Sequence, residues 1–176
     1  HQLNGRFYKV EMVSAYNSLL IIFPALVDFD SISATIKTLY NAPRLKATAV
    51  KRLWKIPVCY ENGFGIDMAE FAKAKNTTPE EIIKMHTAPV YTIFCIGFLP
   101  GFMYLGGLDK MLYQPRRSEP RLEIPQGSVG IGGEQTGVYP QSSPGGWNII
   151  GNSPIKVFDV TKKNPCPLNV GDKVKF

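Results

Sequence analysis

The sequence predicts an α+β protein in two parts, residues 1–48 and 49–176. Three observations lead to this prediction. The first part reads as two strands and a helix, and the second part begins with two short helices that carry start signals. From Val90 onward the chain reads as strands and turns only. Short strands separated by glycine and proline are typical of a closed or nearly closed β-barrel, which we expect for the second part.

The first part starts with a β-rich segment at residues 7–23, which is interrupted at Tyr16 and therefore predicts two strands. Asp28 and Asp30 suit the start of a helix, and the apolar residues that follow lie on one helical face. Three elements make a poor independent core, so this segment resembles part of a larger domain. The chain opens on His1 without an initiator methionine, which indicates a tag remnant or a truncated start.

The second part opens with KRLWKIPVCY, a predicted strand whose Pro57 indicates an edge position or a bulge. Two helices follow. Asp67 with Glu70 has the spacing of a capping box, and so has Thr78 with Glu81. A proline between Thr78 and Glu81 occupies the first helical position. The later strands are predicted at VYTIFCI, SVGIGG, WNIIG, IKVFDV and DKVKF.

Composition excludes several classes of protein. The net charge is +6, but the basic residues are scattered and form no stripe, which argues against nucleic-acid binding. No apolar run approaches the roughly 18–20 residues that span a bilayer. The three cysteines are far apart and predict no disulfide framework, which favours a reducing cytoplasm, and two histidines cannot form a histidine-rich metal site.

Three arginines are the first candidate site. Arg116, Arg117 and Arg121 lie among turn-forming prolines, which indicates a loop of fixed shape. A guanidinium on such a loop suits bidentate recognition of a carboxylate or phosphate. The alternative is that the arginines are solvated or pair with Glu119 and Glu123.

A second candidate is the loop YPQSSPGGWNIIG at residues 139–151, where proline and glycine together specify one loop shape. We expect Trp147 to anchor this loop. The loop and the arginines would then form a pocket for an anionic substrate or for the reacting edge of a partner protein. The alternative is a packed surface loop. The predicted substrate-binding residues are Arg116, Arg117, Arg121, Gln135, Tyr139, Ser143, Gly145 and Gly146, with Ser142 beside them.

His86 is the candidate catalytic residue. It ends the second predicted helix, where the helix dipole favours an imidazolium, and it could transfer protons at the barrel mouth. The alternative is a core histidine whose ring is satisfied by a backbone carbonyl. No phosphate-binding loop, nucleophile elbow or metal motif is complete in the sequence.

Three motifs carry a resemblance to a known family. GFLPGFMYLGGL, PRRSEPRLEIPQGSVGIGGEQTGVYP and SPGGWNIIG resemble the family of the 5-oxoprolinase B subunit, also called KipI or allophanate hydrolase subunit 1. The same module forms half of the carboxyltransferase region of urea carboxylase. The likeness runs from about Val13 to Phe176. This sequence departs from the family at the missing N-terminal residues and at Asn152, where the family usually has arginine.

The resemblance implies a partial N-terminal α+β (DCoH-like) domain followed by a cyclophilin-like β-barrel. It also implies ATP-dependent conversion of 5-oxo-L-proline to L-glutamate, performed together with subunits A and C of the 5-oxoprolinase. Because the chain has no ATP-binding loop of its own, we expect a shared ATP site, no metal site and no activity for the chain alone. The alternatives are inhibition of a sensor histidine kinase and a carboxyltransferase-related component of a urea carboxylase or allophanate hydrolase system.

Overall fold

The computed structural model of the chain describes residues 10–43, 51–61 and 63–176, in two compact units at residues 1–50 and 51–176. The first unit pairs β1 (Glu11–Ser14) with β2 (Leu19–Ile22) in an antiparallel hairpin, followed by α1 (Phe29–Asn41). The Asp28 side chain caps α1 by accepting from the Asp30 amide at 3.2 Å. The two strands and the helix are confirmed. None of residues 10–43 is buried, as expected for three elements without a complete core.

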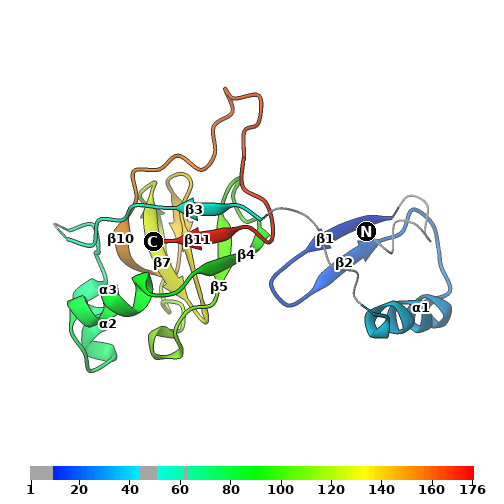
Figure 1. Ribbon diagram of the computed structural model, residues 1–176, viewed down its shortest axis with the longest axis horizontal. Helices are drawn as coiled ribbons and strands as arrows, with labels where there is room; N and C mark the ends of the chain where they lie inside the picture. The colour runs from blue at the N-terminus through cyan, green and yellow to red at the C-terminus, as the bar shows by residue number, and fades with distance from the viewer. Residues whose placement is uncertain (1–9, 44–50, 62) are drawn as a thin grey trace. The chain divides into compact units, whose positions relative to one another are not determined.

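The second unit is built on a strongly curled seven-stranded sheet (Figure 1). Neighbouring strands are antiparallel, except for one parallel pair at the edge. A separate ribbon pairs β6 (Arg121–Ile124) with β9 (Ser143–Gly145). The seven strands, in the order in which they pair, are β10 (Asn148–Asn152), β7 (Ser128–Gly132), β8 (Gln135–Val138), β5 (Met103–Gly106), β4 (Tyr91–Ile96), β11 (Lys173–Lys175) and β3 (Leu53–Lys55).

One segment connects the two edges of this sheet. β3 pairs in parallel with β11, and just after it the Ile56 amide donates to the Lys175 carbonyl at 2.9 Å. Past Pro57, Cys59 and Asn152 exchange two backbone hydrogen bonds of 2.8 Å with each other. The chain therefore leaves β11 and reaches β10 at the opposite edge, a path that can be followed in Figure 1. The edge position predicted from Pro57 agrees with this course.

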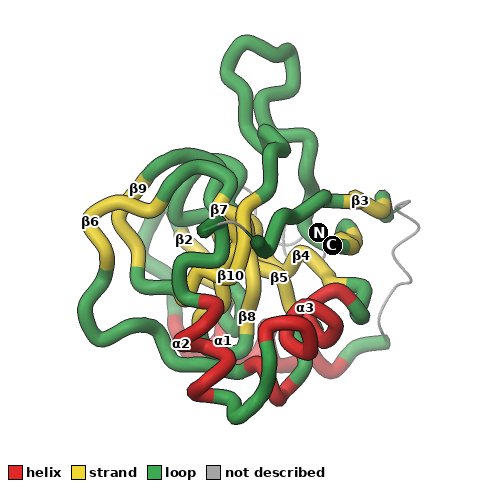
Figure 2. Tube along the Cα trace, turned by 90° about the vertical axis from the view of Figure 1, so that its left-hand side faces the viewer, coloured by secondary structure: helices red, strands yellow, loops and turns green. Residues whose placement is uncertain are grey.

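Two helices lie side by side at one end of the sheet (Figure 2). α2 (Met68–Ala74) contacts β10, and α3 (Pro79–Thr87) follows it. The Thr78 hydroxyl accepts from the Glu81 amide at 3.3 Å, which confirms the predicted helix start. A single 3₁₀ turn, η1 (Lys110–Leu112), interrupts the strands that follow. Within the described part of the chain, no helix is long and apolar enough to cross a membrane.

The main core fills the inside of the curled sheet and includes Phe71 and Ile82 from the helices. Their burial follows from the amphipathic pattern of these two short helices. The cysteines Cys59, Cys95 and Cys166 are free, and Cys95 is buried. Burial raises the pKa of the Cys95 thiol, which disfavours a reactive thiolate.

The prediction of a strand at IKVFDV was wrong. Residues 155–160 form no strand and lie in a loop that turns back on itself. The Asp159 amide donates to the Pro165 carbonyl at 2.9 Å, and the Asp159 carboxylate accepts from the amide and hydroxyl of Thr161. These local hydrogen bonds satisfy the backbone in place of a sheet ladder. Four short strands, β5, β6, β8 and β9, were not predicted.

Asp172 joins the parallel edge to the rest of the sheet. Its buried carboxylate accepts from the Arg52 amide at 3.1 Å, from the Trp54 indole at 2.9 Å and from the Asn169 amide at 3.1 Å. Burial alone would raise the pKa of this carboxyl, but the hydrogen bonds from Trp54 and the two amides outweigh it and lower the pKa.

We predict that Asp172→Ala lowers the free energy of unfolding by about 3 kcal/mol, because it leaves buried donors unpaired. Urea denaturation of both proteins measures the difference. Asp159→Ala, which removes a carboxylate from an exposed loop, is the control and should change stability far less. Equal losses in the two variants would contradict the role assigned to Asp172.

Candidate functional site

An aromatic pocket lies over a second, smaller core. This core consists of Phe102, Ile124, Tyr139, Trp147 and Ile149, and it is separate from the main core inside the sheet. The Phe102 ring contacts the rings of Tyr139 and Trp147 edge to face, with centroids 5.1 Å and 5.2 Å apart. The pocket has a volume of about 250 Å³ and is lined by Phe98, Phe102, Tyr104, Arg116, Pro120, Tyr139, Pro144, Gly145, Gly146 and Trp147.

The pocket combines apolar walls with a few polar groups. Arg116 is the one charged residue among the described residues that line it. Burial raises the pKa of Tyr139 to about 12 and also raises the pKa of Tyr104, so both phenols stay protonated at neutral pH. A cation, two hydroxyl donors and aromatic walls together suit a small ligand that has an apolar body and an anionic group.

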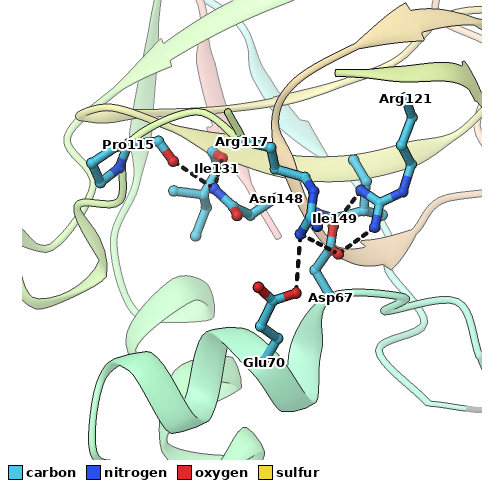
Figure 3. Close-up of polar contacts among 8 residues, drawn as sticks. All are labelled: Asp67, Glu70, Pro115, Arg117, Arg121, Ile131, Asn148 and Ile149. Carbon is cyan, nitrogen blue, oxygen red and sulfur yellow. Dashed lines mark hydrogen bonds and ion pairs between the residues drawn. The ribbon is translucent and has the colours of Figure 1, made fainter. Parts of the chain in front are cut away.

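The loop that carries Arg116 is held in place on both sides of this residue. The Asn148 side-chain amide donates to the Pro115 carbonyl at 3.0 Å and to the Ile131 carbonyl at 3.1 Å (Figure 3). On the other side, the Arg117 amide donates to the Gly146 carbonyl at 2.7 Å. The prolines of the sequence therefore do not act alone, because backbone contacts also fix the loop. Arg121 is not on a loop, since it begins β6.

Trp147 packs closely against glycines of the β7–β8 hairpin. A Cβ atom at Gly132 would lie 2.5 Å from the indole nitrogen, and one at Gly137 would lie 3.2 Å from the indole ring. A side chain at Gly132 would displace the tryptophan, and a Cβ atom at Gly137 would also lie only 2.6 Å from the Met103 carbonyl oxygen, so close approach requires glycine at both positions. Trp147 is buried and directly precedes β10, which fixes the loop that supplies Gly145 and Gly146 to the pocket.

Arg117 and Arg121 do not line the pocket, because both bind Asp67 (Figure 3). Arg121 reaches the two carboxylate oxygens of Asp67 through Nη1 at 2.9 Å and Nη2 at 2.5 Å. Arg117 Nη1 lies 3.1 Å from Asp67 Oδ1 and 3.0 Å from the carboxylate of Glu70. Pairing of the arginines with the neighbouring Glu119 and Glu123 was the alternative considered from the sequence, but Asp67 and Glu70 are the partners.

The Asp67 carboxylate also accepts from the Ile149 amide at 2.7 Å, while the Asp67 amide donates to the Ile149 carbonyl at 2.8 Å. Asp67 occupies the N-cap position of α2 as predicted, but its side chain makes no cap hydrogen bond, so the predicted capping box does not form. The Asp67 side chain is 3% exposed, and burying a carboxylate without charged partners is costly. Its pairing with the arginines therefore takes precedence over a cap hydrogen bond. Glu70 likewise turns to Arg117 instead of completing a capping box.

His86 is fully buried in the main core region, away from the residues that line the pocket. Its Nδ1 lies 2.8 Å from the Tyr60 hydroxyl, and its Nε2 lies 2.9 Å from the Thr136 hydroxyl. The Thr136 hydroxyl donates to the Gly130 carbonyl, so it accepts from His86 Nε2–H, and Nδ1 accepts from Tyr60. The Phe176 ring stacks on the imidazole.

Burial lowers the pKa of His86 to about 3, so the imidazole is neutral at physiological pH. The expectation of an imidazolium at the end of the helix was therefore wrong, because the cost of desolvating the charge outweighs the helix dipole at a fully buried position. The predicted barrel-mouth position does not match this environment either. The ring is satisfied by two hydroxyls, whereas the alternative had assumed a backbone carbonyl.

Three other predicted positions lie outside the pocket lining. Ser143 is buried and its hydroxyl donates to the Pro144 carbonyl, while Ser142 donates to Glu123. Gln135 pairs with Gly132 across the β7–β8 hairpin, and its buried side-chain nitrogen has no hydrogen-bond partner within the described structure. Asn152, where the family usually has arginine, donates to the Gln126 carbonyl at 2.9 Å and so has a structural role.

Phe98 stands at the rim of the pocket in an unusual backbone conformation. Its φ angle is +69°, and the residue is 62% exposed. A bulky residue in the left-handed region is strained, and such strain is concentrated at functional sites. Sequence patterns alone gave no signal for this conformation or for the Asp67 contacts. No group of three or more metal-binding side chains occurs among the residues that the structure describes.

The comparisons with known proteins agree on one family. The family described as "Carboxyltransferase domain, subdomain C and D" matches residues 3–168. The chain is 44% identical over 175 residues to the 5-oxoprolinase B subunit of Haemophilus influenzae, which covers 99% of this chain and 82% of that protein. The chain belongs to the carboxyltransferase family that contains this B subunit. The resemblance carried by the three sequence motifs is thereby confirmed.

Solved structures support the mixed α/β fold. A protein of Pyrococcus horikoshii matches with a TM-score of 0.68 and 35% identity, over 99% of this chain and 82% of the other. Urea carboxylase from Kluyveromyces lactis matches with a TM-score of 0.74 over 99% of this chain and 18% of the enzyme. Because the identity to urea carboxylase is 19%, that match shows a shared fold only.

We predict that His86 makes the stability of the chain depend on pH. The folded pKa of about 3 lies below the unfolded value of 6.5, so the unfolded state takes up a proton first as the pH falls. The stability contributed by this group is complete above about pH 6.5 and is lost between there and pH 3, by about 2 kcal/mol at pH 5.

Urea denaturation at about pH 7.5 and 5 tests this prediction in the wild-type chain and in His86→Gln. The variant should be less stable at neutral pH but should lose less stability on acidification. The same loss in both proteins would show that His86 does not carry the effect.

Proposed function

We propose that the chain is the B component of an ATP-dependent 5-oxoprolinase complex, which converts 5-oxo-L-proline to L-glutamate with hydrolysis of ATP. The name of the Haemophilus influenzae relative supports the assignment at the level of the family. The single structural observation that supports it is the pocket in which Arg116 stands among aromatic walls. 5-Oxoproline has one carboxylate on a small, flat ring, and the pocket offers one guanidinium beside apolar surface.

In this proposal Arg116 holds the substrate carboxylate, and the aromatic walls contact the ring. The hydroxyls of Tyr104 and Tyr139 are the candidate donors to the lactam oxygen, since both stay protonated. Gly145 and Gly146 allow close approach of the ligand to the loop. Gln135 and Ser143 stay predicted substrate contacts, although neither lines the pocket.

Arg117, Arg121 and His86 take supporting roles in this proposal. The two arginines are committed to Asp67 and hold the loop that carries Arg116. His86 is committed to Tyr60 and Thr136 in the interior, so its predicted proton transfer would require a rearrangement of the core. We therefore assign substrate contact to the pocket and core packing to His86.

ATP requires a site outside this pocket. A cavity of about 250 Å³ is smaller than the roughly 300–1,000 Å³ of pockets that enclose drug-sized ligands, and one arginine cannot balance a triphosphate. A lactam is a poor electrophile, and phosphorylation of its amide oxygen by ATP would activate it. We propose that subunits A and C complete the nucleotide site next to this pocket. We also place the complex in the cytoplasm, because three free thiols are stable in a reducing compartment.

The finer architecture is part of this proposal. We assign residues 1–48 to a partial DCoH-like domain and residues 49–176 to a cyclophilin-like barrel. A second candidate function is that of a carboxyltransferase-related component, which the description of the matching family and the shared fold of urea carboxylase favour.

Reconstitution tests the proposed function. We expect no ATP hydrolysis in response to 5-oxoproline by the chain alone, and release of glutamate and ADP when subunits A and C are added. Activity of the chain alone would contradict the division of the site. A complete complex that ignores 5-oxoproline but uses urea or a related amide would favour the second candidate.

We predict that Arg116→Gln raises the KM for 5-oxoproline at least tenfold, about 1.4 kcal/mol, because it removes the cation of the pocket. Gly146→Ala should also raise the KM without loss of stability. A Cβ at Gly146 would have its nearest neighbours at 3.6 and 3.8 Å, so the fold accepts the methyl group while the pocket narrows.

Steady-state kinetics of the complex and thermal unfolding of the chain measure these two effects. Lys110→Gln removes a positive charge from an exposed position outside the pocket and is the matched control. Wild-type KM values in both pocket variants would place the substrate elsewhere.

A further inference from the structure

The charge balance beside the pocket is unusual. The segment Arg116–Arg121 carries three guanidinium groups and the carboxylate of Glu119, and Arg117 and Arg121 form ion pairs with carboxylates from a different part of the chain. The four charges of Asp67, Glu70, Arg117 and Arg121 sum to zero. Arg116 is left as the uncompensated cation among the described residues of the pocket wall.

This neutral cluster lies directly behind the pocket wall. Arg121 pairs with Gly145 across the β6–β9 ribbon, and Gly145 lines the pocket. The Arg117 amide donates to the carbonyl of Gly146, which is also a lining residue. Ile149, whose amide binds Asp67, follows Trp147 by two residues. A change in the net charge of the cluster would therefore change the electrostatic potential in the pocket.

A ligand with one negative charge is matched by Arg116. A second carboxylate or an ammonium group would have to leave water without a counter-charge in the wall, and such desolvation is costly. The same reasoning separates the proposed substrate from its product. 5-Oxoproline has one charged group, whereas glutamate has two carboxylates and an ammonium group.

We propose that Asp67 and Glu70 set the charge selectivity of the pocket. By neutralising Arg117 and Arg121, they restrict the pocket to small cyclic monocarboxylates and exclude open-chain dicarboxylates, which favours release of the product. This inference rests on the proposed function for the identity of the substrate. The selectivity itself is a property of the chain and can be measured with simple acids.

Two acids of similar size but different charge test this selectivity. Cyclopentanecarboxylate is a cyclic monoanion, and glutarate is an open-chain dianion. Isothermal titration of each acid into the chain, alone and with its partner proteins, gives the ratio of their dissociation constants. The wild-type ratio should favour cyclopentanecarboxylate. Glu70→Gln leaves Arg117 partly uncompensated and should shift the ratio toward glutarate by roughly threefold at low salt, with a smaller shift at high salt.

Asp67→Asn should shift the ratio further, because it removes the carboxylate charge that pairs with both Arg117 and Arg121. That variant loses buried ion pairs and can fail to fold, so Glu70→Gln, at a side chain that is 72% exposed, provides the decisive measurement. Glu80→Gln removes the same charge from exposed α3 and is the matched control, which should keep the wild-type ratio.

An unchanged ratio in Glu70→Gln, or no binding of either acid to the wild-type protein, would overturn the inference. A failure of the proposed function gives a different result, in which the complete complex shows no response of ATP hydrolysis to 5-oxoproline. The charge selectivity would then still be measured by the ratio of the dissociation constants of the two acids.

Discussion

The buried carboxylate of Asp67 is the constraint on which the site depends. It binds Arg117, Arg121 and the amide of Ile149, so a single charge fixes α2, the β6–β9 ribbon and β10 relative to one another. A charge this deep is tolerated only because every element around it supplies a donor. The geometry of the pocket wall follows from this requirement as much as from the apolar residues that fill it.

The two cores of the second unit have different roles. The core inside the curled sheet contains His86 and most aliphatic residues, and it provides a stable base. The smaller core outside consists mainly of aromatic rings and supports the pocket. Glycines of the β7–β8 hairpin connect the two, because they let the Trp147 indole approach the sheet. Most residues that line the pocket lie in loops, and the packing of Trp147 against strands β7 and β8 holds one of these loops in place.

Local signals in the sequence predicted the elements that local physics decides. Thr78 and Glu81 are three residues apart, and their helix start is present as expected. The partners of Asp67 lie 50, 54 and 82 residues away in the sequence. The local capping-box spacing therefore could not predict that its side chain binds these residues instead of the helix. The pocket residues Arg116, Tyr139, Gly145 and Gly146 were predicted from turn chemistry and from the family motifs, and the structure brings them together. The burial of His86 depends on Tyr60, Thr136 and Phe176, which no short pattern connects.

The segment from β3 to Cys59 has a consequence for how this unit fits into larger proteins. Exposed sheet edges offer unpaired backbone groups to any neighbouring strand. Here one stretch of chain pairs with β11 through β3 and then with β10 at Cys59, so β11 and β10 both receive backbone hydrogen bonds from the same segment. β3 itself stays at the edge of the sheet but spans only three residues, which leaves little backbone for a neighbouring strand to pair with. The fold can therefore be joined to other domains without losing its own strand order, and the same fold occurs within the much longer urea carboxylase chain.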